Sequence, residues 1–259
     1  MAATLSTRRP ATMAAEHYAI LAATIAAAYT VFGLTGFGAA MVAVPVLVQF
    51  LPLQFVVPML LLLDLVATAV VGVRNRSSVS HTELFRLLPF MMIGVALGTT
   101  VLAKLESRWL LVGLGLFVLA MTARALMGSS GRMAAAAKGW SVPAGVIGGV
   151  FSALFGTGGP IYTMYLASRL PEIDVFRSTI ASVILSSAVA RLLAFAGGGL
   201  LQQDELWRSA AFAMPFSLAG LAVGSCLRRR IAADAVRRAL LVFLGASGAS
   251  VLVRGLLMR

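Results

Sequence analysis

The sequence predicts an all-α polytopic membrane protein with about eight transmembrane helices in two homologous repeats. Of its 259 residues, 60% are hydrophobic and only 12% are charged, whereas soluble domains are about half apolar and a quarter charged. Apolar runs of near-spanning length also follow one another along the chain with short linkers between them. A bilayer is therefore the expected solvent, and function is expected inside it.

Each apolar run approaches the roughly 20 residues that cross the hydrocarbon core. In order, the runs cover residues 17–34, 55–73, 84–103, 108–127, 140–155, 174–196, 207–227 and 235–257. The first run follows Arg8 and Arg9, but we interpret it as a retained span because further spans follow and no small-residue cleavage site closes it. The linkers are too short for a separate soluble domain.

Charge and cysteine content narrow the expected partners. The formal net charge is +12, but Arg and Lys cluster in short loops such as Arg228–Arg230, where anionic lipid headgroups attract them. Membrane lipids are therefore expected partners, and nucleic acid is not. The single Cys226 and the lack of paired Cys or Cys/His spacings predict no metal or other cofactor. The short loops on the two sides of the membrane carry nearly equal numbers of Lys and Arg, so the sequence does not predict the orientation of the chain in the membrane.

The two halves of the chain look like one four-helix unit written twice. Glu83–Arg86 and Glu205–Arg208 share the order Glu-Leu-aromatic-Arg, and each opens an apolar helix with two glycines four residues apart. We expect repeats at 17–127 and 140–257, joined by a polar linker at 128–139. Secondary transporters are often built this way, with the substrate site where the repeats meet. The paired glycines, Gly94 with Gly98 and Gly220 with Gly224, favour close helix packing.

A glycine-rich break interrupts the first helix of each repeat. The apolar stretch 18–51 would form a helix roughly 50 Å long, so we expect a break at Gly36 and Gly38 and a half-helix from Ala39 to Phe50. In the second repeat, Pro160 follows the break, as suits the first turn of a new helix. The glycines concerned there are Gly156, Gly158 and Gly159.

Each half-helix is expected to begin inside the membrane. A helix start has unpaired N–H groups and a partial positive charge, and glycine lets an anion approach the backbone. The breaks thus predict a site for a small anionic substrate. The alternative is that the glycines serve only close helix packing.

Three charged residues fall in or beside the spans. Asp64 lies mid-run, where an acid is costly and is typical of proton or ion relays, although it could serve a structural hydrogen bond. Arg191 could pair with Asp64, attract an anion or extend toward the interface. Arg177 opens the span after the second half-helix, where it could face a bound anion or anchor the helix at the interface.

The two glycine breaks, the Phe176–Thr179 helix start and the paired repeats together resemble the sulfite exporter TauE/SafE family, from about residue 20 to 257. The resemblance implies export or uptake of sulfite, organosulfonates or related anions. It supports as site-lining residues Gly36, Gly38, Gly156, Gly158, Gly159 and Arg177. The chain departs from the family's Gly-x-Gly-Gly-Gly motif at Ala39, Ala40 and Pro160, which leaves the exact substrate open.

We therefore expect a secondary transporter of a small anion in the inner (cytoplasmic) membrane of a prokaryote, with proton coupling through Asp64 as one option. A non-transporting membrane scaffold is the first alternative. An intramembrane enzyme is the second, and it is disfavoured because His17 and His81 fall at span edges and assemble no catalytic group. The chain has no P-loop for ATP, and its oligomeric state is not readable.

Overall fold

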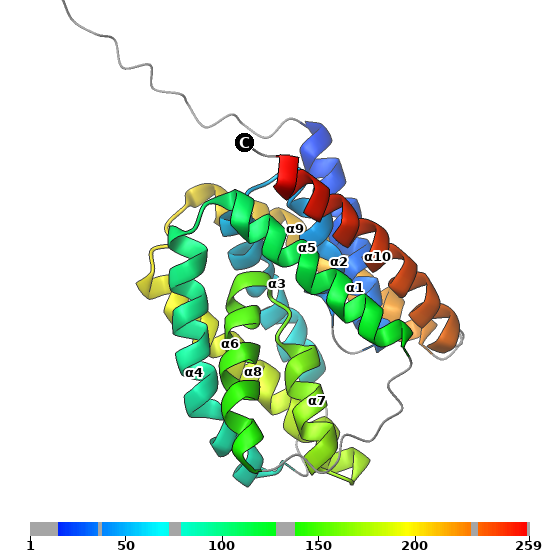
Figure 1. Ribbon diagram of the computed structural model, residues 1–259. Coiled ribbons are helices and arrows are strands. Elements are labelled where there is room, and N and C mark those ends of the chain that lie inside the picture. The colour runs from blue at the N-terminus through cyan, green and yellow to red at the C-terminus, as the bar shows by residue number, and fades with distance from the viewer. Residues whose placement is uncertain (1–14, 36–37, 73–78, 128–137, 229–232, 258–259) are drawn as a thin grey trace, which may run out of the picture.

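The computed structural model describes residues 15–35, 38–72, 79–127, 138–228 and 233–257. All regular structure in these ranges is helical, as the sequence predicts (Figure 1). A short 3-10 helix, Lys138–Trp140, precedes α6. The α-helices are α1 Ala15–Thr35, α2 Ala39–Leu47, α3 Leu53–Gly72, α4 His81–Lys104, α5 Ser107–Leu126, α6 Ser141–Phe155, α7 Gly159–Arg169, α8 Ile173–Gly197, α9 Asp204–Leu227 and α10 Ala233–Leu257.

Within the described ranges, seven helices are long and apolar enough to cross a membrane: α1, α3, α4, α5, α8, α9 and α10. Helices suit this solvent because a helix satisfies its own backbone hydrogen bonds where no water can. The prediction of a polytopic membrane protein is confirmed. The run at 140–155 forms α6, which has 15 residues. Its length of about 22 Å falls short of the hydrocarbon thickness of about 30 Å.

The helices end and restart at glycines on both sides of the chain's midpoint. Gly38 precedes α2 with a φ of 95°, and Gly156 follows α6 with a φ of 68°, both in the left-handed region that favours glycine. Pro160 stands in the first turn of α7. The short helices α2 and α7 have 9 and 11 residues, or about 14 and 17 Å, so neither crosses the membrane alone. Gly36 lies outside the described residues.

Long helices pair across the halves of the chain, with glycines at the contacts. Helix α1 packs along α9, and α4 packs along α6. A Cβ atom added to Gly33 would lie 2.6 Å from the carbonyl oxygen of Leu221, and one added to Gly98 would lie 2.7 Å from that of Val150. Such backbone contact is how small residues drive helix association in membranes. Each of these pairs joins a helix from one half to a helix from the other.

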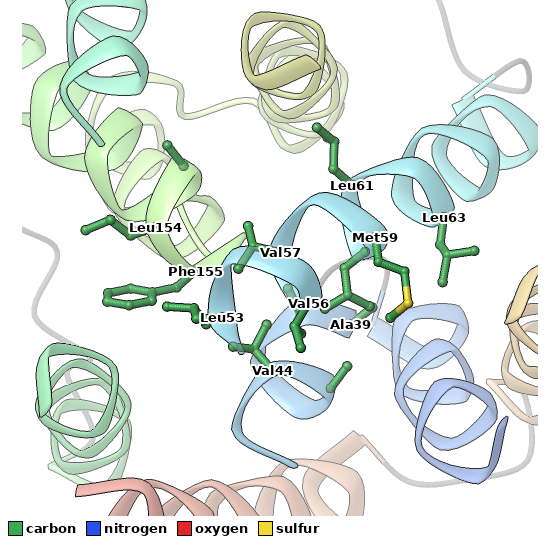
Figure 2. Close-up of a cluster of buried hydrophobic side chains, with 14 of the residues drawn as sticks. Ala39, Val44, Leu53, Val56, Val57, Met59, Leu61, Leu63, Leu154 and Phe155 are labelled. Carbon is green, nitrogen blue, oxygen red and sulfur yellow. The ribbon is translucent and has the colours of Figure 1, made fainter. Parts of the chain in front are cut away.

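Helix α2 lies in the apolar core. Seven of its nine residues are buried, although a helix at a bilayer surface would bury only one face. Figure 2 shows Val44 of α2 beside Leu53 and Val56 of α3, with Phe155 of α6 close by. Protein therefore surrounds this half-helix, and its first turn faces other side chains instead of lipid.

The close glycine contacts predict opposite effects for two otherwise similar substitutions. Gly98→Ala adds a Cβ against the Val150 backbone and should destabilise the protein by about 1–3 kcal/mol, as overpacking does. In α8, Gly197 has no atom within 4 Å of an added Cβ, so Gly197→Ala should stabilise by roughly 0.5–1 kcal/mol. Thermal unfolding in detergent measures both. Equal midpoints for the two variants would contradict the assigned contact between α4 and α6.

Candidate functional site

A cavity of about 130 Å³ lies where the two half-helices begin. Since a cavity needs only about 10–15 Å³ on this measure to hold one water, the space is large enough for several waters or a small polyatomic ion. Its wall comes from α1, α2, α3, α6, α7 and α8 and from the two glycine breaks. The lining residues used below are Gly38, Ala39, Ala40, Asp64, Ser152, Gly156, Thr157, Gly158, Gly159, Ala181, Ser187 and Arg191.

Two helix starts face this cavity. The residues Gly38 and Ala39 of the first and Gly158 and Gly159 of the second line it. Neither helix has a side-chain hydrogen bond at its N-cap. Met41 and Ile161 donate to the carbonyl oxygens of Gly38 and Gly158, so among the described residues it is the first N–H groups, those of Ala39 and Gly159, that are left for another acceptor. The two breaks also meet, because a Cβ added to Gly156 would lie 2.9 Å from the Cβ of Ala40. Both partial positive charges thus act on one small space.

A buried guanidinium adds a full positive charge. Arg191 on α8 is 4% exposed, and its Nη1 donates to the carbonyl oxygen of Ser152 at 3.3 Å. Its Nε has no hydrogen-bond partner, and no carboxylate oxygen of the described residues lies within 4.0 Å of the guanidinium. A buried cation without an ion-pair partner is costly. The side chain is therefore placed to receive an anion.

A single acid shares the cavity. Asp64 on α3 is half-buried, and its Oδ1 accepts a hydrogen bond from the hydroxyl of Tyr29 on α1 at 2.7 Å. Tyr29 is itself fully buried. This partner was missed in the sequence, where the available signal was a tyrosine inside an apolar run, since a buried phenol needs an acceptor.

Hydroxyl groups complete the polar wall. The sequence had indicated Ser187 as one of several α8 hydroxyls that could line a polar path, but Ser152 and Thr157 were missed as site residues. Ser152 on α6 and Ser187 on α8 share a hydrogen bond of 2.7 Å between their hydroxyl oxygens. Thr157 is 3% exposed, and its hydroxyl has no hydrogen-bond partner in the part of the chain that the structure describes. Buried polar atoms are normally satisfied, so an unpaired hydroxyl beside Arg191 indicates a polar ligand.

The structure brings most of the predicted site residues together and leaves one apart. Those that line the cavity are Gly38, Gly156, Gly158, Gly159, Asp64 and Arg191. Arg177 is exposed near the start of α8, and it is 14 residues, or about 21 Å of helix, from Arg191. Gly36 lies outside the described residues, so its place relative to the cavity is not described.

A multi-pass helical protein that encloses a charged cavity between broken helices has the construction of a membrane transporter. The chain belongs to the sulfite exporter TauE/SafE family, whose model matches residues 20–251. It is also 32% identical over 194 residues to the "Probable inner membrane transporter protein TsaS" of Comamonas testosteroni, covering 74% of this chain and 80% of that protein. No solved structure matches the chain.

The left-handed backbone at Gly38 predicts a stability difference between two site glycines. Among the described residues, an added Cβ would meet no atom within 4 Å at either Gly38 or Gly159, but of these two glycines only Gly38 has a positive φ. Gly38→Ala should therefore cost about 1–2 kcal/mol through backbone strain, whereas Gly159→Ala should leave the unfolding midpoint close to that of the parent. Thermal unfolding in the same detergent tests this, and a Gly38→Ala midpoint equal to the parent's would contradict the assigned conformation.

Proposed function

We propose that the protein is a secondary transporter that moves a sulfur oxyanion, such as sulfite or a small organosulfonate, across the inner membrane. The anion binds in the cavity between the starts of α2 and α7. The observation that carries this proposal is the buried guanidinium of Arg191, which has an unpaired Nε beside two uncapped helix starts. Charge-assisted hydrogen bonds to an oxyanion would use these donors.

The charges in the cavity suit an anion of low valence. Each helix start contributes about half a positive charge, and Arg191 contributes one, while an ionised Asp64 subtracts one. The sum of about +1 is balanced by a monoanion. Protonation of Asp64 raises the sum by one charge and favours a dianion. Anion binding and proton binding at Asp64 would then reinforce each other, which is a basis for proton coupling.

The relatives and the helix pairing support the same proposal. The family is described as sulfite exporters, and the relative is named as an inner membrane transporter. Helix α1 of the first repeat packs on α9 of the second, and α6 of the second repeat packs on α4 of the first. Two homologous repeats that exchange their first helices would pack in this way. This supports repeats at 17–127 and 140–257 with a linker at 128–139. Rocking of one repeat against the other would open the cavity to each side in turn.

The first prediction from this proposal separates the two arginines. In liposomes, saturable uptake of radiolabelled sulfite should fall by about tenfold or more in Arg191→Gln, because a charged hydrogen-bond donor to the anion is lost. Arg177→Ala should retain uptake near the parent level, since Arg177 lies outside the cavity. Empty liposomes give the baseline, and an organosulfonate is the second substrate. Full uptake in a correctly folded Arg191→Gln variant would rule out the site.

A second prediction concerns Asp64. An imposed pH gradient should change the rate of uptake by the parent protein, and this response should disappear in Asp64→Asn, which cannot exchange a proton. Tyr29→Phe removes only the 2.7 Å hydrogen bond and keeps the carboxyl group, so it should keep the response. Parallel flux measurements at matched protein density compare the three. A gradient response that persists in Asp64→Asn would assign the coupling elsewhere.

A further inference from the structure

A second acid, away from the cavity, ties one half-helix to its neighbour. Glu83, in the first turn of α4, is 5% exposed. Its Oε2 accepts from the Tyr165 hydroxyl at 2.6 Å, and its Oε1 accepts from Arg169 Nη2 at 2.9 Å and Nε at 3.2 Å. Arg86, one turn further along α4, adds a contact of 2.9 Å to the same oxygen. One carboxylate thus has three partners.

Two of these partners lie on α7, the helix whose first residues line the cavity. Tyr165 and Arg169 are in its second half, and the whole helix spans only about 17 Å. A short helix moves as a rigid unit, so any displacement of its end also displaces its start. While Glu83 holds Tyr165 and Arg169, α7 cannot shift relative to α4 without breaking charge-assisted hydrogen bonds, which are among the strong ones.

Within the described ranges, the Glu205 end of the repeated motif has no equivalent contact to a half-helix. Glu205 opens α9 with the same Glu-Leu-aromatic-Arg order as Glu83, yet among the described residues its hydrogen bond comes from the Tyr18 hydroxyl of α1, at 3.3 Å. The end of α2 is instead held by Arg254 of α10, which donates to the carbonyl oxygen of Val48 at 2.8 Å. The two half-helices are therefore anchored to different neighbours in this conformation.

Water can reach the contact around Glu83. The side chains of Arg86 and Arg169 are 28% and 22% exposed, and Glu83 lies at the end of its span. Separated charges could be rehydrated there, which avoids most of the penalty that breaks a fully buried pair. The contact around Glu83 is strong enough to hold α7, and water can reach it when it opens. The core contacts of α2 are buried and are not open to water in this way.

We propose that Glu83, Tyr165 and Arg169 form a latch that ties the end of α7 to the start of α4 in the conformation seen here and opens when the cavity becomes accessible from the opposite side. The inference rests on the proposed transport function, because it assigns the step that exchanges access to that cavity. The latch sets the population of the two access states and takes no part in binding the anion.

The test measures access to the cavity without any substrate. In a Cys226→Ser background, which removes the exposed native thiol, Ala181→Cys places a thiol at the exposed, cavity-lining position on α8. A cationic, membrane-impermeant methanethiosulfonate is added to either face of vesicles of known orientation. The labelling rates from the two faces report the two access states.

Loss of the latch should shift those rates in opposite directions. Glu83→Gln should increase labelling from the slower face by about tenfold, because the ion pair between Glu83 and Arg169 is lost, and should reduce it from the faster face. Tyr165→Phe removes one hydrogen bond and should give a shift of about fivefold in the same direction. Glu205→Gln is the matched control, since it alters the same motif without touching a half-helix, and should leave both rates unchanged.

Each outcome decides for or against the latch. Parent-like labelling from both faces in a monodisperse Glu83→Gln variant overturns it, as does an equal shift in Glu205→Gln. Should Glu83→Gln not fold, parent-like labelling in Tyr165→Phe and Arg169→Lys overturns it equally. Shifted labelling in a protein that carries no sulfite or organosulfonate would support the latch and reject the proposed substrate. Sulfite flux that depends on Arg191, with labelling rates unchanged in Glu83→Gln, would support the proposed substrate and reject the latch.

Discussion

Every part of this structure depends on one constraint, that backbone N–H and C=O groups inside lipid must find partners within the protein. A helix can begin or end in the bilayer only where other protein surrounds the exposed groups. The breaks at Gly38 and Gly156 therefore require the layer of long helices around them, and α2 is buried on nearly all sides. The groups left unpaired at the break are the ones that a ligand can use. The polar site and the apolar bundle are two results of the same rule.

Within the bundle, charge is distributed between two separate places. The cavity joins Arg191 and Asp64 without a direct ion pair, which under the proposed function leaves both side chains available to a substrate or a proton. At the edge of the membrane, Glu83 is fully engaged with Arg86, Arg169 and Tyr165. Incomplete pairing suits binding, because an unpaired donor gains most from a new partner. Complete pairing suits the holding of a mobile helix in place.

The sequence was informative where the chemistry of a residue is unusual for its surroundings. Glycines in a long apolar run, an acid in mid-span and an arginine within an apolar run all marked residues that the structure places around one cavity. It was uninformative where the answer depends on which residues meet in space. Nothing in the local pattern distinguished Arg191 from Arg177, because the choice depends on which turn of α8 passes the glycine breaks. The Tyr29 partner of Asp64, and the α7 partners of Glu83, lie on other helices.

The glycine contacts between α1 and α9 have a consequence for how the protein is made. The tight surface of α1 around Gly33 fits the backbone at Leu221, and 168 residues lie between the end of α1 at Thr35 and the start of α9 at Asp204. At roughly 5–20 residues per second, the ribosome needs on the order of 10 to 30 seconds to supply that partner. During this interval the first helix must remain in the bilayer with its glycine face against lipid or the insertion machinery. The first half therefore cannot mature before the second, and the chain becomes a finished bundle only near the end of its synthesis.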